Sequence, residues 1–378
     1  MKLARTLGLL ATLAASSLGA VASTPGITDD RIVLGQSAPL SGPAQALGTE
    51  MRAGAQLYFD MVNAQGGVNG RKIELITLDD GYEPTRTVDN TKKLLGETQV
   101  FALFGYVGTP TSAAALPLVN EAQVPFVGAY TGAELLRAPH NRQVFNIRAS
   151  YFDETEHIVN QLVTTGVRNI AVFYQNDAYG KAGLEGVERA MSRRNLKVSA
   201  TATVERNTTD VAAAAKSLLA VKPDAIIQIS AYKSCAALIR EMKKAGSASQ
   251  FYNVSFVGSQ ALADELGDDG VGVVISQVVP FPWSGTETVV RQYQQLAQQA
   301  GAERYSFTAL EGFIAAKVLV EGLRRSGKAP TRNDLVNALE GLQNYDVGGF
   351  RVNFAPGNHN GSNFVELTIL SRNGRFLR

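Results

Sequence analysis

Short apolar runs alternate with longer amphipathic segments from residue 31 almost to the end of the chain. Several of the short runs are apolar on both faces, as buried parallel β-strands require. The longer segments repeat apolar residues at helical spacing, and glycines stand where several of them end. The alternation predicts an α/β fold. The predicted strands are 32–39, 73–78, 101–106, 169–175, 225–230, 254–258, 271–279 and 364–370, and the predicted helices are 50–64, 83–96, 109–121, 153–165, 179–194, 209–220, 232–245, 286–300, 307–325 and 332–342.

Each strand–helix–strand unit implies a right-handed crossover, so the expected product is an open, doubly wound parallel sheet. The alternation extends over about 350 residues, which exceeds one domain of ordinary size and predicts two sheets. The alternation is interrupted at three segments, 137–150, 278–283 and 353–363. If each of them crosses between two lobes, a cleft hinged by three strands lies between the lobes.

Composition narrows the class of protein. The chain has 378 residues, of which 45% are hydrophobic and 19% charged, so it can bury a large core. A single cysteine, Cys235, excludes a disulfide framework within one chain, and we expect it to be buried. Because 36 basic residues balance 34 acidic ones, no basic excess is present to bind a phosphate backbone, and nucleic acid is not an expected partner.

The N-terminus has the pattern of a secretory signal. Lys2 and Arg5 precede a small apolar stretch at 7–22, which ends in Ala20-Val21-Ala22. About 16 residues rich in Ala, Gly and Ser fall short of the roughly 20 that span a bilayer. We therefore expect residues 1–22 to be a cleaved signal peptide, and the mature protein to be soluble and periplasmic.

In open α/β sheets, ligands bind beyond the carboxyl ends of the strands, where helix N-termini present free backbone N–H groups. The turn at 104–112 places Thr109 as an N-cap before Pro110, with two more hydroxyls at Thr111 and Ser112. Capping alone accounts for Thr109, yet three hydroxyls in four residues exceed what capping needs. They have the chemistry to hold a carboxylate.

A second turn, at 128–134, leaves the same two interpretations open. Thr131 and Glu134 have capping-box spacing, whereas Gly128 and Gly132 would let a ligand approach the backbone closely. In the second half of the chain, the turns at 176–180, 230–232 and 258–260 each follow a predicted strand, and two of them carry Tyr179 and Tyr232.

Enzyme signatures are missing from the sequence. The three histidines, His140, His157 and His359, lack the spacing of metal ligands, and no phosphate-binding glycine loop or G-x-S-x-G turn occurs. Asp79 and Asp80 are a possible carboxylate pair, but their position predicts that they hold the turn before the next helix. We expect no catalytic residue, no metal and no cofactor.

Several motifs together carry a resemblance to a family. They are the N-terminal signal, the strand and turn at 32–42 with its Pro-Leu-Ser-Gly-Pro, Asn-Ala-Gln-Gly-Gly-Val-Asn-Gly at 63–70, Asp-Asp-Gly-Tyr-Glu-Pro at 79–84 and Asn-Asp-Ala-Tyr-Gly at 176–180. In combination they resemble the periplasmic binding proteins of branched-chain and hydrophobic amino-acid ABC transporters, typified by leucine-binding proteins. The resemblance implies a type I periplasmic binding fold. Its implied lobes are 27–146 with 281–360, and 147–280 with 361–378.

The resemblance also implies a ligand site. In the first lobe, the carboxylate of the ligand would be held by Thr109, Ala129 and Thr131, with Tyr130 adjacent. In the second lobe, the implied residues are Tyr179, Tyr232 and an acid that pairs with the α-ammonium of the ligand, whose place is taken here by Gln260.

A neutral amide such as Gln260 cannot offset a buried ammonium, and an uncompensated buried charge costs several kcal/mol, by order of magnitude. Either another acid substitutes, with Asp177 or Glu311 as candidates, or the ligand has no ammonium. Leu47, where some relatives carry an aromatic residue, leaves the apolar wall of the site open. Branched-chain amino acids and amine-free carboxylates are both compatible with these residues.

The implied function is capture of a small carboxylate-bearing ligand in the cleft and its delivery to an inner-membrane ABC permease, by a monomer whose lobes close on a hinge. The alternative is a periplasmic sensing module that presents the ligand to a membrane receptor, because the sequence within the chain does not separate the two roles.

Overall fold

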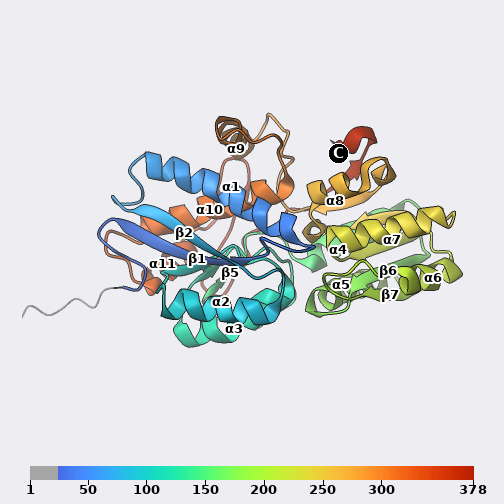
Figure 1. The fold of residues 1–378 in the computed structure, drawn as a ribbon, viewed down its shortest axis with the longest axis horizontal. Helices are drawn as coiled ribbons and strands as arrows, with labels where there is room; N and C mark the ends of the chain where they lie inside the picture. The colour runs from blue at the N-terminus through green and yellow to red at the C-terminus, as the bar shows by residue number, and fades with distance from the viewer. Residues whose placement is uncertain (1–23) are drawn as a thin grey trace, which may run out of the picture.

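The computed structural model describes residues 24–378, so the expected signal peptide at 1–22 lies outside the described residues. Two main sheets form separate layers joined by extended segments (Figure 1). We call each main sheet with its helices a lobe. Within residues 24–378, no helix combines the length and the apolar character that crossing a membrane requires.

The first lobe contains a five-stranded parallel sheet with the order β2-β1-β3-β4-β5. Helices α1 and α10 lie on one side of this sheet, and α2 and α3 lie on the other (Figure 1). The strands are β1 (Arg31–Ala38), β2 (Lys72–Asp79), β3 (Ala102–Phe104), β4 (Phe126–Val127) and β5 (Val144–Phe145); the helices are α1 (Gln45–Ala64), α2 (Pro84–Gly96), α3 (Thr109–Ala122), α9 (Thr288–Gln299), α10 (Phe307–Arg325) and α11 (Arg332–Glu340).

Glycines allow α1 and α10 to pack backbone against backbone. A Cβ atom on Gly54 would lie 1.7 Å from the carbonyl oxygen of Ala309, and one on Gly312 would lie 2.1 Å from that of Met51. Any side chain at either position would force the helices apart. This close packing fixes the start of α10 beside the edge of the first sheet that faces the second lobe.

The second lobe contains a seven-stranded sheet with the order β14-β13-β10-β9-β8-β6-β7, in which β13 alone runs opposite to the other strands and pairs antiparallel with both of its neighbours. Its strands are β6 (Ile170–Gln175), β7 (Thr201–Val204), β8 (Ala225–Ile229), β9 (Gln250–Asn253), β10 (Val274–Gln277), β13 (Glu366–Leu370) and β14 (Phe376–Leu377). Its helices are α4 (Tyr151–Thr164), α5 (Ala178–Ser192), α6 (Ala212–Val221), α7 (Tyr232–Lys244) and α8 (Ser259–Leu266). A hairpin of β11 (Tyr345–Asp346) and β12 (Arg351–Val352) follows α11 in the first lobe.

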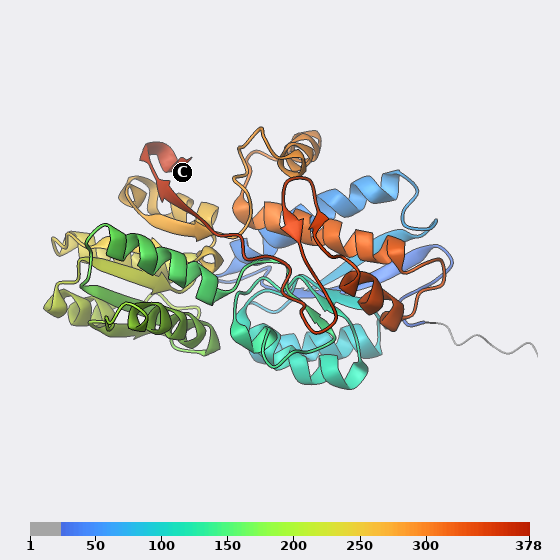
Figure 2. The same ribbon diagram turned by 180° about the vertical axis from the view of Figure 1, so that it is seen from behind.

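The chain passes between the sheets three times: after β5, after β10 and before β13. Figure 2 shows the last passage as the long dark red segment that enters the second sheet as β13. These passages coincide with the three predicted interruptions, so the two-lobed α/β fold with three crossings is confirmed.

One predicted strand is wrong. Residues 254–258 do not extend the sheet, because β9 ends at Asn253 and Ser255–Val257 form a short 3₁₀ helix, η2. The Ser255 N–H and hydroxyl both donate to Glu154, at 2.7 and 3.0 Å, and these bonds take the backbone out of the sheet. The pattern also missed α8, β4, β5 and β7, and it began α1 five residues late.

Candidate ligand site between the lobes

Two hydroxyls meet at the carboxyl edge of the first sheet. Thr109 begins α3 after β3, and Thr131 lies in the turn after the neighbouring strand β4. Their Oγ atoms are 2.6 Å apart and both residues are fully buried. Thr131 also donates to the Tyr151 hydroxyl at 3.2 Å, which links this threonine pair (Thr109 and Thr131) to the first residue of α4.

The capping interpretation of these threonines is wrong for Thr109. The N-cap of α3 is Gly108, at φ 101°, and no side chain caps that helix. A capping box at Thr131 does not form either, since Ala133 is the N-cap of the short 3₁₀ helix at Glu134–Leu136. Among the described residues, the one backbone N–H that donates to the Thr131 hydroxyl is that of Ala133, at a long 3.3 Å. Helix capping therefore does not account for two buried hydroxyls at this edge.

Tyr130, next to the threonine pair, reaches the second lobe. Its hydroxyl donates to the Ser255 carbonyl at 3.2 Å and lies 3.1 Å from the Thr308 hydroxyl. The Arg148 guanidinium is 4.8 Å from the centre of its ring. Ala129, the remaining predicted residue of this turn, is buried and accepts a hydrogen bond from the Thr131 N–H through its carbonyl.

Aromatic rings from both lobes pack around Phe256, which the sequence did not single out. Its ring centre lies 4.5 Å from that of Tyr179 in the second lobe. It lies 5.9 Å from Tyr82 and 5.3 Å from Tyr130 in the first lobe. Tyr151 extends the group, with its ring 5.4 Å from Tyr179. We call these five residues the aromatic cluster.

Tyr179 is the predicted second-lobe residue that joins this cluster. It is the second residue of α5 and is fully buried, and its hydroxyl has no hydrogen-bond partner within residues 24–378. The Ser112 hydroxyl, one of the three noted at the start of α3, is also buried and unpartnered among these residues. Unpaired buried hydroxyls are costly, which makes them candidates for bonds to a ligand.

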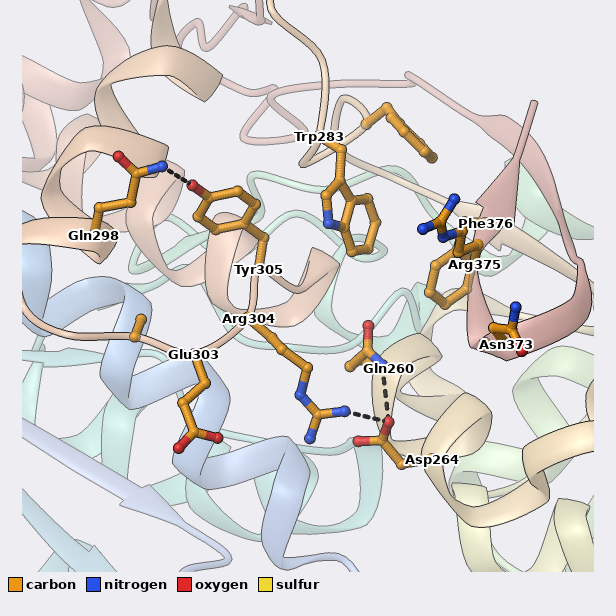
Figure 3. Close-up of a pocket in the computed structure, with 13 residues that line it drawn as sticks. Gln260, Asp264, Trp283, Gln298, Glu303, Arg304, Tyr305, Asn373, Arg375 and Phe376 are labelled. Carbon is orange, nitrogen blue, oxygen red and sulfur yellow. Dashed lines mark hydrogen bonds and ion pairs between the residues drawn. The ribbon is translucent and has the colours of Figure 1, made fainter.

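Tyr232 and Gln260 lie elsewhere on the interface. Tyr232 begins α7, and burial raises the pKa of its hydroxyl. Gln260 donates to the Asp264 carboxylate at 2.9 Å, and the same oxygen of Asp264 pairs with Arg304 at 2.6 Å (Figure 3). Gln260 lines a cavity of about 750 Å³ that none of the other six predicted site residues lines.

That cavity has walls from both lobes. The second lobe supplies α8 and the segment 373–376, and the first lobe supplies the end of α9 with the loop to α10. The crossing segment after β10 adds Phe281 and Trp283. The complete lining is Gln260, Asp264, Phe281, Trp283, Gln298, Ala302, Glu303, Arg304, Tyr305, Asn373, Gly374, Arg375 and Phe376.

Both acids considered as partners for a ligand ammonium already have partners within the protein. Asp177 caps α5 through the Tyr179 N–H at 2.9 Å and pairs with Arg206 at 3.2 Å. Glu311 lies 3.6 Å from Arg148, and burial raises the pKa of its carboxyl to about 7.

Arg148 joins the lobes from within the first crossing. Its guanidinium pairs with Glu154 of α4 at 3.3 Å and with Glu311 of α10 at 3.6 Å, and all three side chains are buried. Glu154 also accepts from the Ser276 hydroxyl at 2.5 Å. A buried arginine between acids of different lobes ties the hinge to both sheets, because removing either partner would leave a buried charge.

A second set of polar contacts bridges the lobes at the edge of the cleft. Arg206 of the second lobe pairs with Glu83 of the first at 2.9 Å, and Asn207 donates to the same carboxylate at 2.7 Å. Gln175 donates to the Tyr82 hydroxyl at 3.2 Å. We call these residues the interlobe latch.

The carboxylate pair Asp79–Asp80 holds a turn, as predicted. Asp79 accepts from the Leu40 N–H at 2.8 Å and pairs with Arg86, also at 2.8 Å. Asp80 accepts from the Ser37 hydroxyl, and burial raises the pKa of its carboxyl to about 6. No group of three or more potential metal ligands occurs in the described part of the chain.

Comparisons with known proteins agree with this architecture. The profile of the family described as "Periplasmic binding protein" matches residues 31–374. The Leu/Ile/Val-binding protein homolog 7 of Brucella abortus is 24% identical over 312 residues, which is 78% of this chain and 77% of that protein.

Two solved structures are more similar in sequence. A possible leucine/isoleucine/valine-binding protein from Rhodopirellula baltica is 36% identical with a TM-score of 0.89, over 92% of this chain and 96% of that one. A substrate-binding periplasmic protein from Ralstonia solanacearum is also 36% identical, with a TM-score of 0.87, over 92% of this chain and 99% of that one.

Proposed function

Since this chain belongs to the periplasmic binding protein family, we propose that it is the extracytoplasmic solute-binding component of an ABC transporter. It captures a small carboxylate-bearing ligand between its lobes and delivers it to an inner-membrane permease. The ligand is a branched-chain or hydrophobic amino acid or a related carboxylate, in line with the relatives named for leucine, isoleucine and valine binding. In this proposal the protein acts in the periplasm as a monomer and catalyses no reaction.

The observation that carries the proposal is the threonine pair. Two buried hydroxyls at the carboxyl edge of a parallel sheet, one of them on the first residue of a helix, are placed as a carboxylate would need them. The N-terminus of α3 adds a partial positive charge and free N–H groups. Thr109, Ala129, Tyr130 and Thr131 form the first-lobe side of the site in this proposal.

The aromatic cluster supplies the opposite side. Phe256 of the second lobe packs against Tyr82 and Tyr130 of the first and against Tyr179 of its own lobe, so an apolar ligand side chain that packs on this cluster would contact both lobes. Tyr232 and Gln260 complete the proposed second-lobe contacts. A ligand that touches both lobes stabilises the closed arrangement, and closure signals to the permease.

A thermal-shift screen of refolded, ligand-free protein tests the proposal. One arm contains leucine, isoleucine, valine and phenylalanine, and the other contains the matched acids without an amine, such as 4-methylpentanoate and 3-phenylpropionate. A ligand at about 100 times its Kd adds roughly 2.7 kcal/mol to the free energy of unfolding, which gives a clear rise in Tm.

Stabilisation by either arm supports carboxylate capture, and the arm that responds decides whether an ammonium is accommodated. If no carboxylate in either arm raises the Tm while a neutral or cationic compound does, the proposal is wrong.

A further inference from the structure

The cavity that contains Gln260 has the dimensions of a small-molecule site. Its volume is about 750 Å³, within the range of roughly 300–1,000 Å³ typical of ligand pockets. It is built from both lobes and does not include the threonine pair or any member of the aromatic cluster. Of the residues proposed for the first site, Gln260 alone lines this cavity.

One wall of this cavity is aromatic and rigid. The Trp283 ring stacks on Phe376, with centres 5.5 Å apart and an interplanar angle of 23°, and Phe281 lies 5.1 Å from it. Phe307 supports both Trp283 and Phe376 from behind, at 5.7 and 5.4 Å. Trp283 nevertheless remains 39% exposed, so a large flat apolar surface faces the cavity in a fixed orientation.

In the described part of the chain, four charged side chains line this cavity: Asp264, Glu303, Arg304 and Arg375. Arg304 and Asp264 neutralise each other in an ion pair of 2.6 Å. Arg375, next to Phe376, forms no ion pair and no side-chain hydrogen bond within residues 24–378. In Figure 3, Arg375 lies on the same side of the cavity as Trp283, whereas the carboxylate of Glu303 points away from both residues. Among the described residues, the cavity thus has one unpaired guanidinium beside the aromatic wall and one unpaired acid, Glu303, whose carboxylate is directed away from that wall.

We propose that this cavity is a second ligand-binding site, which takes a flat aromatic carboxylate. The ring of the ligand stacks on Trp283, and its carboxylate pairs with Arg375, since guanidinium groups favour carboxylates through bidentate hydrogen bonds. Because both lobes line the cavity, its occupant contacts both of them.

The chain offers a direct probe of this site, because Trp283 is the only tryptophan in the sequence. The full mature protein is titrated with 3-phenylpropionate while the tryptophan emission is recorded, with 3-phenylpropylamine as the charge-reversed probe. We expect a saturable change in emission with the acid and none with the amine. Arg375→Gln should weaken binding of the acid about tenfold to hundredfold, since a hydrogen bond to a charged group is lost.

Two control variants separate the explanations. Arg372→Gln removes an exposed arginine in the same C-terminal turn that does not line the cavity, so it should leave the titration unchanged. Thr131→Val should also leave it unchanged, because the two sites are separate. The proposal is overturned if the emission change does not saturate, if acid and amine act alike, if Arg372→Gln weakens binding as much as Arg375→Gln, or if Thr131→Val abolishes the signal.

Discussion

The hydroxyl oxygens of Thr109 and Thr131 lie 2.6 Å apart, although the residues are 22 positions apart in the sequence. They meet because β3 and β4 are neighbours in a parallel sheet, so the turns that follow them lie at the same edge. The two hydroxyls bond each other and neither caps a helix. A carboxylate placed here would accept hydrogen bonds from both, in exchange for the Thr109–Thr131 bond and the Thr131–Tyr151 bond.

The first prediction concerns these hydroxyls. Thr109→Val and Thr131→Val each keep the side-chain shape and remove one hydrogen-bond donor. We expect each variant to weaken carboxylate binding by about 1–3 kcal/mol, because a bond to a charged group is lost, and to lower the Tm, because the remaining buried hydroxyl loses a partner. Isothermal titration with the best ligand from the screen measures the first effect, and calorimetry without ligand measures the second.

Thr155→Val is the matched control for both variants. Thr155 is equally buried, but its hydroxyl donates to the Tyr151 carbonyl at 2.7 Å within its own helix. The Thr155→Val variant should lower the Tm without affecting the Kd of the ligand. Should the variants at 109 and 131 behave like Thr155→Val, the threonine pair is a structural element and does not hold the ligand.

The second prediction concerns Phe256, whose ring fills the space between Tyr82, Tyr130 and Tyr179. Phe256→Ala removes that ring from the aromatic cluster and opens volume beside the proposed site. We expect the variant to accept carboxylates with longer or bulkier apolar chains than the wild type does, and to lose about 3–5 kcal/mol of stability. Affinities for a series of straight-chain carboxylates test the change in size limit.

Phe251→Ala gives the corresponding control, because Phe251 is a buried residue of β9 outside the aromatic cluster. It should cost similar stability without changing the size limit. Phe256→Leu, a milder change, serves if Phe256→Ala fails to fold. An unchanged size limit in both Phe256 variants would show that this ring does not limit ligand size.

The fold was predictable from the sequence because strands buried on both faces appear as continuous apolar runs. The amphipathic helices between them appear as apolar residues repeated at helical spacing. Helix α10 matches its prediction at both ends, 307–325, because Ser306 caps it and its apolar positions repeat without interruption. Strands β4 and β5 were not predicted, because a strand of two residues is too short to show a repeating pattern of apolar positions. Residues 254–258 were read as a strand because their apolar pattern does not reveal the bonds from Ser255 to Glu154.

The site was predictable only where local turns mark it. Thr109 and Thr131 lie in turns that follow neighbouring parallel strands, so the sheet brings both residues to the same edge. Phe256 and Arg206 contact the first lobe across long sequence separations, and no local pattern encodes such contacts. Gln260 was predicted to follow a strand, but it follows the 3₁₀ helix η2, and its side chain lines a cavity that the other predicted residues do not line.

The third prediction concerns the interlobe latch. Arg206→Ala removes the ion pairs with Glu83 of the first lobe and Asp177 of the second. The pair with Glu83 exists only when the lobes are together, so its loss shifts the population toward the open form. We expect ligand affinity to fall by about 1 kcal/mol, roughly fivefold in Kd, and small-angle scattering to show a larger radius of gyration without ligand.

Arg193→Ala tests whether any surface arginine would have this effect. Arg193 pairs with Glu156 at 3.4 Å, and both residues belong to the second lobe. Its removal should alter neither the Kd nor the radius of gyration. An Arg206→Ala protein that matches Arg193→Ala in both measurements would exclude the latch from closure.

The fourth prediction concerns pH and the buried acid Glu311. Burial raises the pKa of its carboxyl to about 7 from an ordinary value of 4.5. Between these values the unfolded chain has released a proton that the folded chain retains, so the free energy of unfolding decreases as pH rises through this window. Glu311→Gln lacks this proton, so the wild type should lose up to about 3 kcal/mol relative to the variant as pH rises from about 4.5 to 7.5.

Urea unfolding of both proteins at a series of pH values gives this difference directly, and other titrating groups cancel because they are common to both. Glu321→Gln, on the same helix but paired with Arg325 at 2.7 Å and partly exposed, is the control and should track the wild type. A difference that instead grows in favour of the wild type with rising pH would mean that the ion pair with Arg148 outweighs burial. Glu311 would then be ionised in the folded protein, and Arg148 would be held by two charged partners across the hinge.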